Sequence, residues 1–178
     1  MLNTAGRLSL ACLIFALSAL PAAAGDDWFV SAYTGKFSDT ELWKILLGQS
    51  SFESSYVSVI SVGREVGAYN EDIDMEWEAQ VGTHRADQSH SELNGVFTLR
   101  WQPFPWDRYA DTSLGFGNGF SYAFAKPPLE ERESDEGETS NILYYILVEL
   151  AVQPPAGSNW EAFIRTHHRS SVYRIIND

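Results

Sequence analysis

The feature that most constrains this fold is the alternation of residue types over unusually long segments. Segment 73–84 places Trp77 on an apolar face, and it places Asp74, Glu76 and Glu78 on the opposite face. Alternation with a period of two is typical of a β-strand. Seven segments are predicted as strands on this basis: 28–35, 56–64, 73–84, 91–101, 114–124, 141–153 and 160–170. We therefore expect an all-β protein with an antiparallel, up-and-down arrangement.

Two kinds of barrel accommodate such strands. A soluble, lipocalin-like barrel packs its apolar faces inward, whereas an outer-membrane barrel turns them to lipid and encloses a polar interior. Segments of 11–13 residues are long enough for the membrane barrel, because a tilted strand crosses a bilayer in about 9–11 residues. In segment 114–124, Phe116 and Phe120 lie on one face and small residues lie on the other. Small residues on the inward face are what the crowded interior of a small barrel requires. These features favour the outer-membrane barrel.

Aromatic and charged residues support the same orientation. Five tryptophans close to predicted strand ends match the interfacial girdle of a membrane barrel: Trp28, Trp77, Trp101, Trp106 and Trp160. We expect Glu76 and Glu78 to form interior ion pairs with Arg100 or Arg165. Single-chain barrels usually have an even number of strands. About eight are expected here, with the eighth either before Trp28 or lost from a truncated C-terminal end.

The first 24 residues read as a secretory signal. Arg7 precedes the apolar stretch 8–20, and Pro21 with the alanines 22–24 supplies a small-residue cleavage site. This predicts a signal peptide at 1–24 and a barrel domain at 25–178, located in the bacterial outer membrane after cleavage. The only cysteine, Cys12, lies in the signal, so the mature chain is expected to have no disulfide.

Composition excludes two other classes of protein. The formal charge of −12, from 24 acidic and 12 basic residues, argues against a nucleic-acid partner, which would require a basic face. A mean hydropathy of −0.20 argues against a bundle of membrane helices. One segment departs from the strand pattern. Ser38 and Glu41 form a capping box, which predicts a short helix at 38–49 in the first long loop.

A histidine and a serine near the C-terminal end point to ester chemistry. His168 and Ser170 share a strand face with Ile164, whereas Arg165 and His167 share the opposite, polar face. We expect His168 and Ser170 to face lipid at the outer leaflet, because odd-numbered strands run outward from a periplasmic N-terminus. A histidine within hydrogen-bond reach of a serine hydroxyl can deprotonate it and create a nucleophile that attacks esters.

Here the chain resembles the outer-membrane lipid A 3-O-deacylase family, whose eight-stranded barrel carries a His-x-Ser motif on its lipid-facing surface. His168, Arg169 and Ser170 match that motif, and segments 76–80, 100–106 and 167–170 resemble a group of proteobacterial outer-membrane proteins related to those deacylases. The resemblance implies an esterase that acts on lipid A, the anchor of lipopolysaccharide. It implies Ser170 as the nucleophile and His168 as the base, with no metal or organic cofactor.

Departures from the family pattern leave a second function open. Ser171 stands where the deacylases often have asparagine, and Asp178 lies too near to replace the glutamate that completes their triad. The alternative is a non-catalytic barrel that is structural or binds lipid or a partner, with His168 and Ser170 at an interfacial strand end. The acidic segment 126–140 is predicted to be a solvated loop, or a contact for divalent cations or lipopolysaccharide. His84 and His90 are predicted to be rim residues, because their spacing supplies no third metal ligand.

Overall fold

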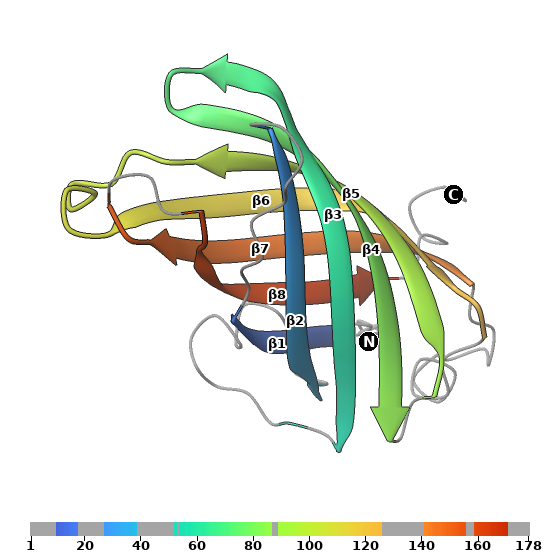
Figure 1. The fold of residues 1–178 in the computed structure, drawn as a ribbon. Helices are drawn as coiled ribbons and strands as arrows, with labels where there is room; N and C mark the ends of the chain where they lie inside the picture. The colour runs from blue at the N-terminus through green and yellow to red at the C-terminus, as the bar shows by residue number, and fades with distance from the viewer. Residues whose placement is uncertain are drawn as a thin grey trace, which may run out of the picture.

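The structure, a computed structural model, describes residues 10–17, 27–38, 52, 54–86, 89–125, 141–155 and 159–170. Eight antiparallel strands follow one another around a closed barrel, and the last pairs with the first (Figure 1). This confirms the predicted all-β, up-and-down barrel. The strands are β1 (Leu10–Leu17), β2 (Trp28–Ser38), β3 (Ser55–Asn70), β4 (Ile73–Ala86), β5 (Ser91–Trp101), β6 (Asp111–Ala123), β7 (Ile142–Gln153) and β8 (Ala162–Ser170).

The seven predicted segments correspond to β2 through β8, and the eighth strand precedes Trp28. β1 lies within the predicted signal peptide, where Leu10 pairs with Arg169 of β8 and Ala11 pairs with Ser38 of β2. Cleavage after residue 24 would remove β1 and leave the facing edges of β2 and β8 to be paired by another strand. The closed barrel therefore uses a strand that the predicted cleavage would remove.

Removal of residues 1–24 is a direct prediction. We expect the mature protein to begin at Gly25, because the charge, apolar stretch and small residues of 1–24 meet the requirements for signal cleavage. N-terminal sequencing and intact-mass measurement of the protein purified from its host check this. A mass that retains residues 1–24 would instead assign β1 to the working barrel.

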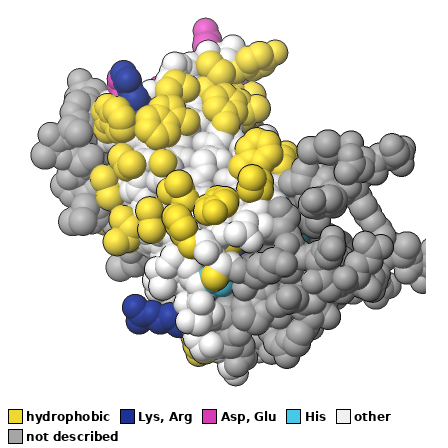
Figure 2. Space-filling model, turned by 90° about the vertical axis from the view of Figure 1, so that its right-hand side faces the viewer, with side chains coloured by type: hydrophobic (Ala, Val, Ile, Leu, Met, Phe, Trp, Pro, Cys, Tyr) yellow, Lys and Arg dark blue, Asp and Glu magenta, His cyan; other side chains and the backbone are white. Residues whose placement is uncertain are grey.

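Along β4, β5 and β6, the side chains point in the directions expected from the sequence. Glu78 and Arg165 are 4 % and 2 % exposed in the interior, whereas Ile60 and Phe116 are 67 % and 53 % exposed on the outer surface. Figure 2 shows hydrophobic side chains gathered over one outer face of the barrel. This is the reverse of the arrangement in a soluble, lipocalin-like barrel. Exposed apolar side chains of the strands include Ile60, Val81, Leu93, Phe97, Leu99, Phe116, Phe120, Leu150 and Ile164.

The small residues of β6 face the interior, as predicted. A Cβ atom on Gly117 would lie 2.6 Å from Oγ1 of Thr98 and 2.9 Å from Cγ2 of Val96 on the neighbouring β5. Both distances are shorter than side-chain contacts allow, so only glycine fits beside these inward residues. The interior is thus filled by side chains, as expected for a barrel of eight strands.

The two ends of the barrel differ in their connections and their aromatic residues. β3 and β4, β5 and β6, and β7 and β8 follow one another at one end, which we call the short-turn end. β2 and β3, β4 and β5, and β6 and β7 follow one another at the other, the long-loop end. Strand directions place all five tryptophans of the predicted girdle toward the short-turn end, where the Trp28 and Trp77 rings pack edge to face at 5.5 Å. Exposed aromatic residues also occur at the long-loop end: Tyr56, Tyr122 and Phe124. The five tryptophans of the predicted girdle therefore gather toward one end of the barrel.

Two sequence predictions fall largely outside the described residues. Ser38 is the last residue of β2, and the rest of the predicted helix, 39–49, is not among the described residues. The acidic segment 126–140 also lies outside the described residues. Within the part of the chain that is described, no helix is long and apolar enough to cross a membrane.

Candidate functional site

A network of ion pairs crosses the interior toward the short-turn end. Arg100 donates from Nε to Glu76 at 2.7 Å and from Nη2 to Glu149 at 2.7 Å. Arg165 donates from Nε to Glu149 at 2.6 Å and from Nη1 to Glu78 at 2.9 Å. These contacts confirm the predicted pairing of Glu76 and Glu78 with the two arginines. They add Glu149 of β7 as the carboxylate that joins both guanidinium groups.

Neutral polar groups lie between this network and the long-loop end. The Tyr33 hydroxyl lies 3.1 Å from Oε1 of Gln80 and 3.1 Å from Nδ1 of His167. The Tyr145 hydroxyl lies 3.4 Å from the same Nδ1 atom. Asn94 donates to Gln80 at 3.3 Å. His167 is therefore held in the interior by side chains from β2 and β7, which agrees with its predicted place on the polar face of β8.

Glu92 of β5 is the centre of a second cluster. Its Oε1 atom lies 2.9 Å from Nε2 of His167, and its Oε2 atom lies 3.1 Å from Nε2 of His84 and 3.2 Å from Nη1 of Arg169. A Cβ atom on Gly82, the residue of β4 paired with Glu92, would lie 2.8 Å from Cγ of Glu92. The absence of a side chain at Gly82 therefore provides the space that the Glu92 side chain occupies.

His90 joins this cluster from the connection between β4 and β5. The rings of His84 and His90 are stacked, with centroids 4.2 Å apart and planes inclined by 9°. Nε2 of His90 lies 3.4 Å from Nη1 of Arg169. Burial is the main cause that lowers the pKa of His90 to about 3, and the neighbouring His84 and Arg169 also contribute to this lowering. The imidazole of His90 is therefore neutral near pH 7 and keeps a lone pair for a ligand.

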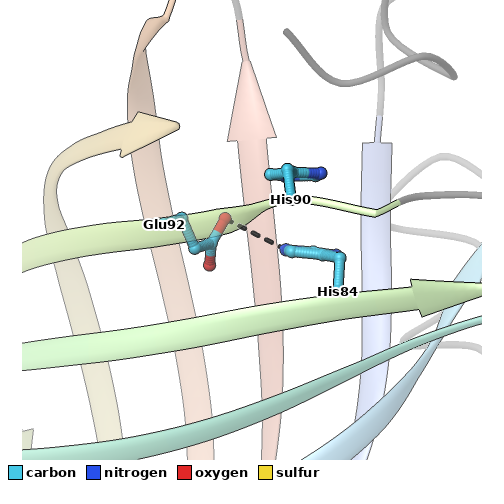
Figure 3. A group of neighbouring side chains, drawn as sticks. All are labelled: His84, His90 and Glu92. Carbon is cyan, nitrogen blue, oxygen red and sulfur yellow. Dashed lines mark ion pairs between the residues drawn. The ribbon is translucent and has the colours of Figure 1, made fainter. Parts of the chain in front are cut away.

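Together, His84, His90 and Glu92 form a possible set of metal ligands. One ligand atom from each lies within 4.8 Å of the others, and all three residues are buried. Figure 3 shows His84 and Glu92 directed toward each other, with His90 beside them. The sequence-based prediction that no third ligand accompanies the two histidines is wrong. Glu92 follows His90 by two residues and shares its strand face, so period two could have identified it.

The structure places His168 and Ser170 on the last strand without completing a catalytic geometry. His168 pairs with Ile146 and has the strand parity of the exposed Ile164, but its own side chain is only 7 % exposed. The expected exposure to lipid is therefore not observed for His168. Ser170 is the last residue of β8 and pairs with Tyr144, and its side chain is not among those described.

Comparison with known proteins does not add a family. Neither the family models, nor the curated proteins, nor the solved structures contain a match to this chain.

Proposed function

We propose that this chain is an outer-membrane barrel that hydrolyses an ester-linked acyl chain of lipid A, with Ser170 as nucleophile and His168 as base. The observation that carries the proposal is the orientation of the barrel. Apolar side chains cover its outer surface, and the interior holds buried charged side chains together with two small apolar clusters. Such a surface is stable in a bilayer and places any outward-facing residue of a strand against lipid.

The position of the two residues on β8 supports the esterase. They are two residues apart on one strand, which brings their side chains to the same face about 6.6 Å apart along the strand. β8 ends at the long-loop end, and larger loops usually lie on the extracellular side of bacterial barrels. In the proposed membrane orientation, the end of β8 would lie in the leaflet that holds the fatty acyl esters of lipid A.

The proposed reaction has two steps. Ser170 Oγ attacks the ester carbonyl while His168 accepts the serine proton, and the same proton then passes to the departing alkoxide of the glycolipid. Water, deprotonated by His168, attacks the acyl-serine and releases a free fatty acid, and the proton returns to Ser170. Lipid A is left with a free hydroxyl group, and no oxidant or cofactor is consumed.

Replacing Ser170 by alanine is expected to reduce acyl release by at least about 10³-fold, because loss of a nucleophile removes the covalent pathway. Mass spectrometry of lipid A after incubation with the purified barrel measures the released chain. Ser58→Ala is the matched control, since Ser58 is an exposed serine on β3 and is expected to leave release unchanged. Acyl release by Ser170→Ala at the rate of the unaltered protein would reject the assignment.

A non-catalytic barrel is the second candidate, and the observation that favours it is the burial of His168. A base held away from the bilayer does not reach an ester in lipid. This candidate predicts a folded barrel without measurable acyl release from lipid A. Activity that is lost in His168→Ala, by about 10²–10⁴-fold for a general base, would exclude it.

A further inference from the structure

We propose that His84, His90 and Glu92 bind a transition-metal ion of the Zn²⁺ type inside the barrel at its long-loop end. The ligand atoms come from the end of β4, the connection after it and the start of β5, so one hairpin supplies all three. The proposed ligands belong to β4, β5 and the connection between them, whereas the proposed esterase residues belong to β8. The metal site goes beyond the proposed function and does not depend on it.

The donor set determines the class of ion. Two imidazole nitrogens and one carboxylate oxygen match the three-ligand sites that hold Zn²⁺ and leave a position for water. Ca²⁺ and Mg²⁺ prefer sites made of oxygen ligands, so they fit this set poorly. The stacked arrangement of the two rings requires a side-chain rotation of His90 before both nitrogens can point at one ion.

One buried polar atom of the cluster lacks a partner. Nδ1 of His90 has no hydrogen-bond partner among the described residues, whereas Nε2 of His84 lies 3.1 Å from Oε2 of Glu92. A buried polar atom without a hydrogen bond destabilises the fold. A bound cation would coordinate the nitrogen and oxygen lone pairs of these atoms directly.

Arg169 competes with the proposed ion for the same atoms. Its Nη1 atom lies 3.2 Å from Oε2 of Glu92 and 3.4 Å from Nε2 of His90. Two cations at this distance repel each other strongly in a buried site. Metal binding therefore requires the Arg169 guanidinium to leave Glu92, and a variant without that charge should bind the ion more tightly.

His167 would orient the carboxylate ligand rather than bind the metal. Its Nε2 atom lies 2.9 Å from Oε1 of Glu92, the oxygen that does not contact His84, and its Nδ1 atom lies 3.1 Å from the Tyr33 hydroxyl. Such partners behind a ligand fix its orientation, and their loss typically weakens metal affinity by about 10–100-fold. We assign His167 this positioning role.

Titration of the full-length barrel in detergent micelles with Zn²⁺ alone tests the site. We expect saturable binding at one ion per chain by calorimetry, weakened at least about 100-fold in His90→Ala and in Glu92→Gln. Arg169→Met is expected to bind Zn²⁺ at least about tenfold more tightly than the unaltered chain. Co²⁺ in place of Zn²⁺ should give the visible absorption of a four- or five-coordinate ion, and this absorption should be missing in His90→Ala.

His168→Ala is the matched control, since it removes a neighbouring histidine that lies outside the proposed ligands. It should leave Zn²⁺ affinity unchanged and, if the proposed esterase is correct, should lose acyl release. The two proposals can therefore fail separately. Equal Zn²⁺ affinity in the unaltered chain, His90→Ala and Glu92→Gln would overturn the metal site, as would an Arg169→Met variant that binds no more tightly. Near-ultraviolet circular dichroism verifies that each variant keeps its folded barrel.

Discussion

Replacing Arg165 by methionine is expected to lower the free energy of unfolding by about 3–5 kcal/mol, the usual effect of removing one partner from a buried ion pair. Three carboxylates, those of Glu76, Glu78 and Glu149, share two guanidinium groups in the interior. Without Arg165, Glu78 loses its 2.9 Å contact and Glu149 loses one of its two arginines. Methionine retains most of the side-chain volume, so the measured loss reports charge rather than packing.

Urea unfolding in phospholipid vesicles, followed by tryptophan fluorescence, measures this effect. Arg64→Met is the matched control, because the Arg64–Asp27 pair at 3.3 Å is solvent-exposed and should contribute no more than about 1 kcal/mol. Adding Glu78→Gln to Arg165→Met should restore part of the lost stability, since it removes the unpaired charge. An Arg165→Met effect as small as that of Arg64→Met would mean that the interior network is not formed.

The second large effect is expected on the outer surface. Phe97 lies in the middle of β5 and is 43 % exposed, so Phe97→Arg should place a charge at mid-bilayer depth. The expected cost is about 2–4 kcal/mol of unfolding free energy in vesicles. The reason is that a guanidinium loses its hydration among lipid chains and has no partner there.

Tyr69→Arg provides the comparison. Tyr69 lies at the short-turn end of β3, next to the connection with β4, and is also exposed. Charges near the membrane interface cost only about 0–1 kcal/mol. Equal effects at positions 69 and 97 would indicate that the outer surface does not contact lipid, which would contradict the proposed membrane location.

Much of the barrel could be predicted because period two determines both the strand and its orientation. In β4 and β5, the inward face of Glu76, Glu78 and Arg100 was evident from the sequence, and so was their pairing across the interior. The central role of Glu149 could not be predicted. It follows only when β7 is known to lie between β5 and β8, the strands that carry the two arginines. Long-range neighbours follow from closure of the barrel, not from the local pattern.

Other features depend on geometry that a strand pattern does not contain. β3 continues to Asn70, six residues beyond its predicted end, because register shifts between Glu65 and Gly67 and between Ala68 and Asn70 accommodate extra residues in the ladder. Gly67 has a φ of +144°, a conformation that glycine adopts readily. Such bulges break the alternation, so the periodicity ends before the strand does.

The candidate sites likewise combine features that are visible in the sequence with features that only the three-dimensional arrangement determines. The spacing of His168 and Ser170 was visible, yet the burial of His168 depends on what covers the strand. Glu92 was missed because the two histidines were considered without it. The strand register, which sets Gly82 opposite Glu92, leaves the space that this carboxylate occupies.

The most direct test of the central claim measures which strand positions contact lipid. Nitroxide labels placed one at a time at positions 94–99 of β5, in a chain whose Cys12 is replaced by serine, report collisions with oxygen in the bilayer. The structure predicts frequent oxygen collisions at positions 95, 97 and 99 and rare ones at 94, 96 and 98, because the odd positions face outward. The reverse alternation, or high accessibility of the odd positions to a water-soluble nickel complex, would contradict the membrane barrel.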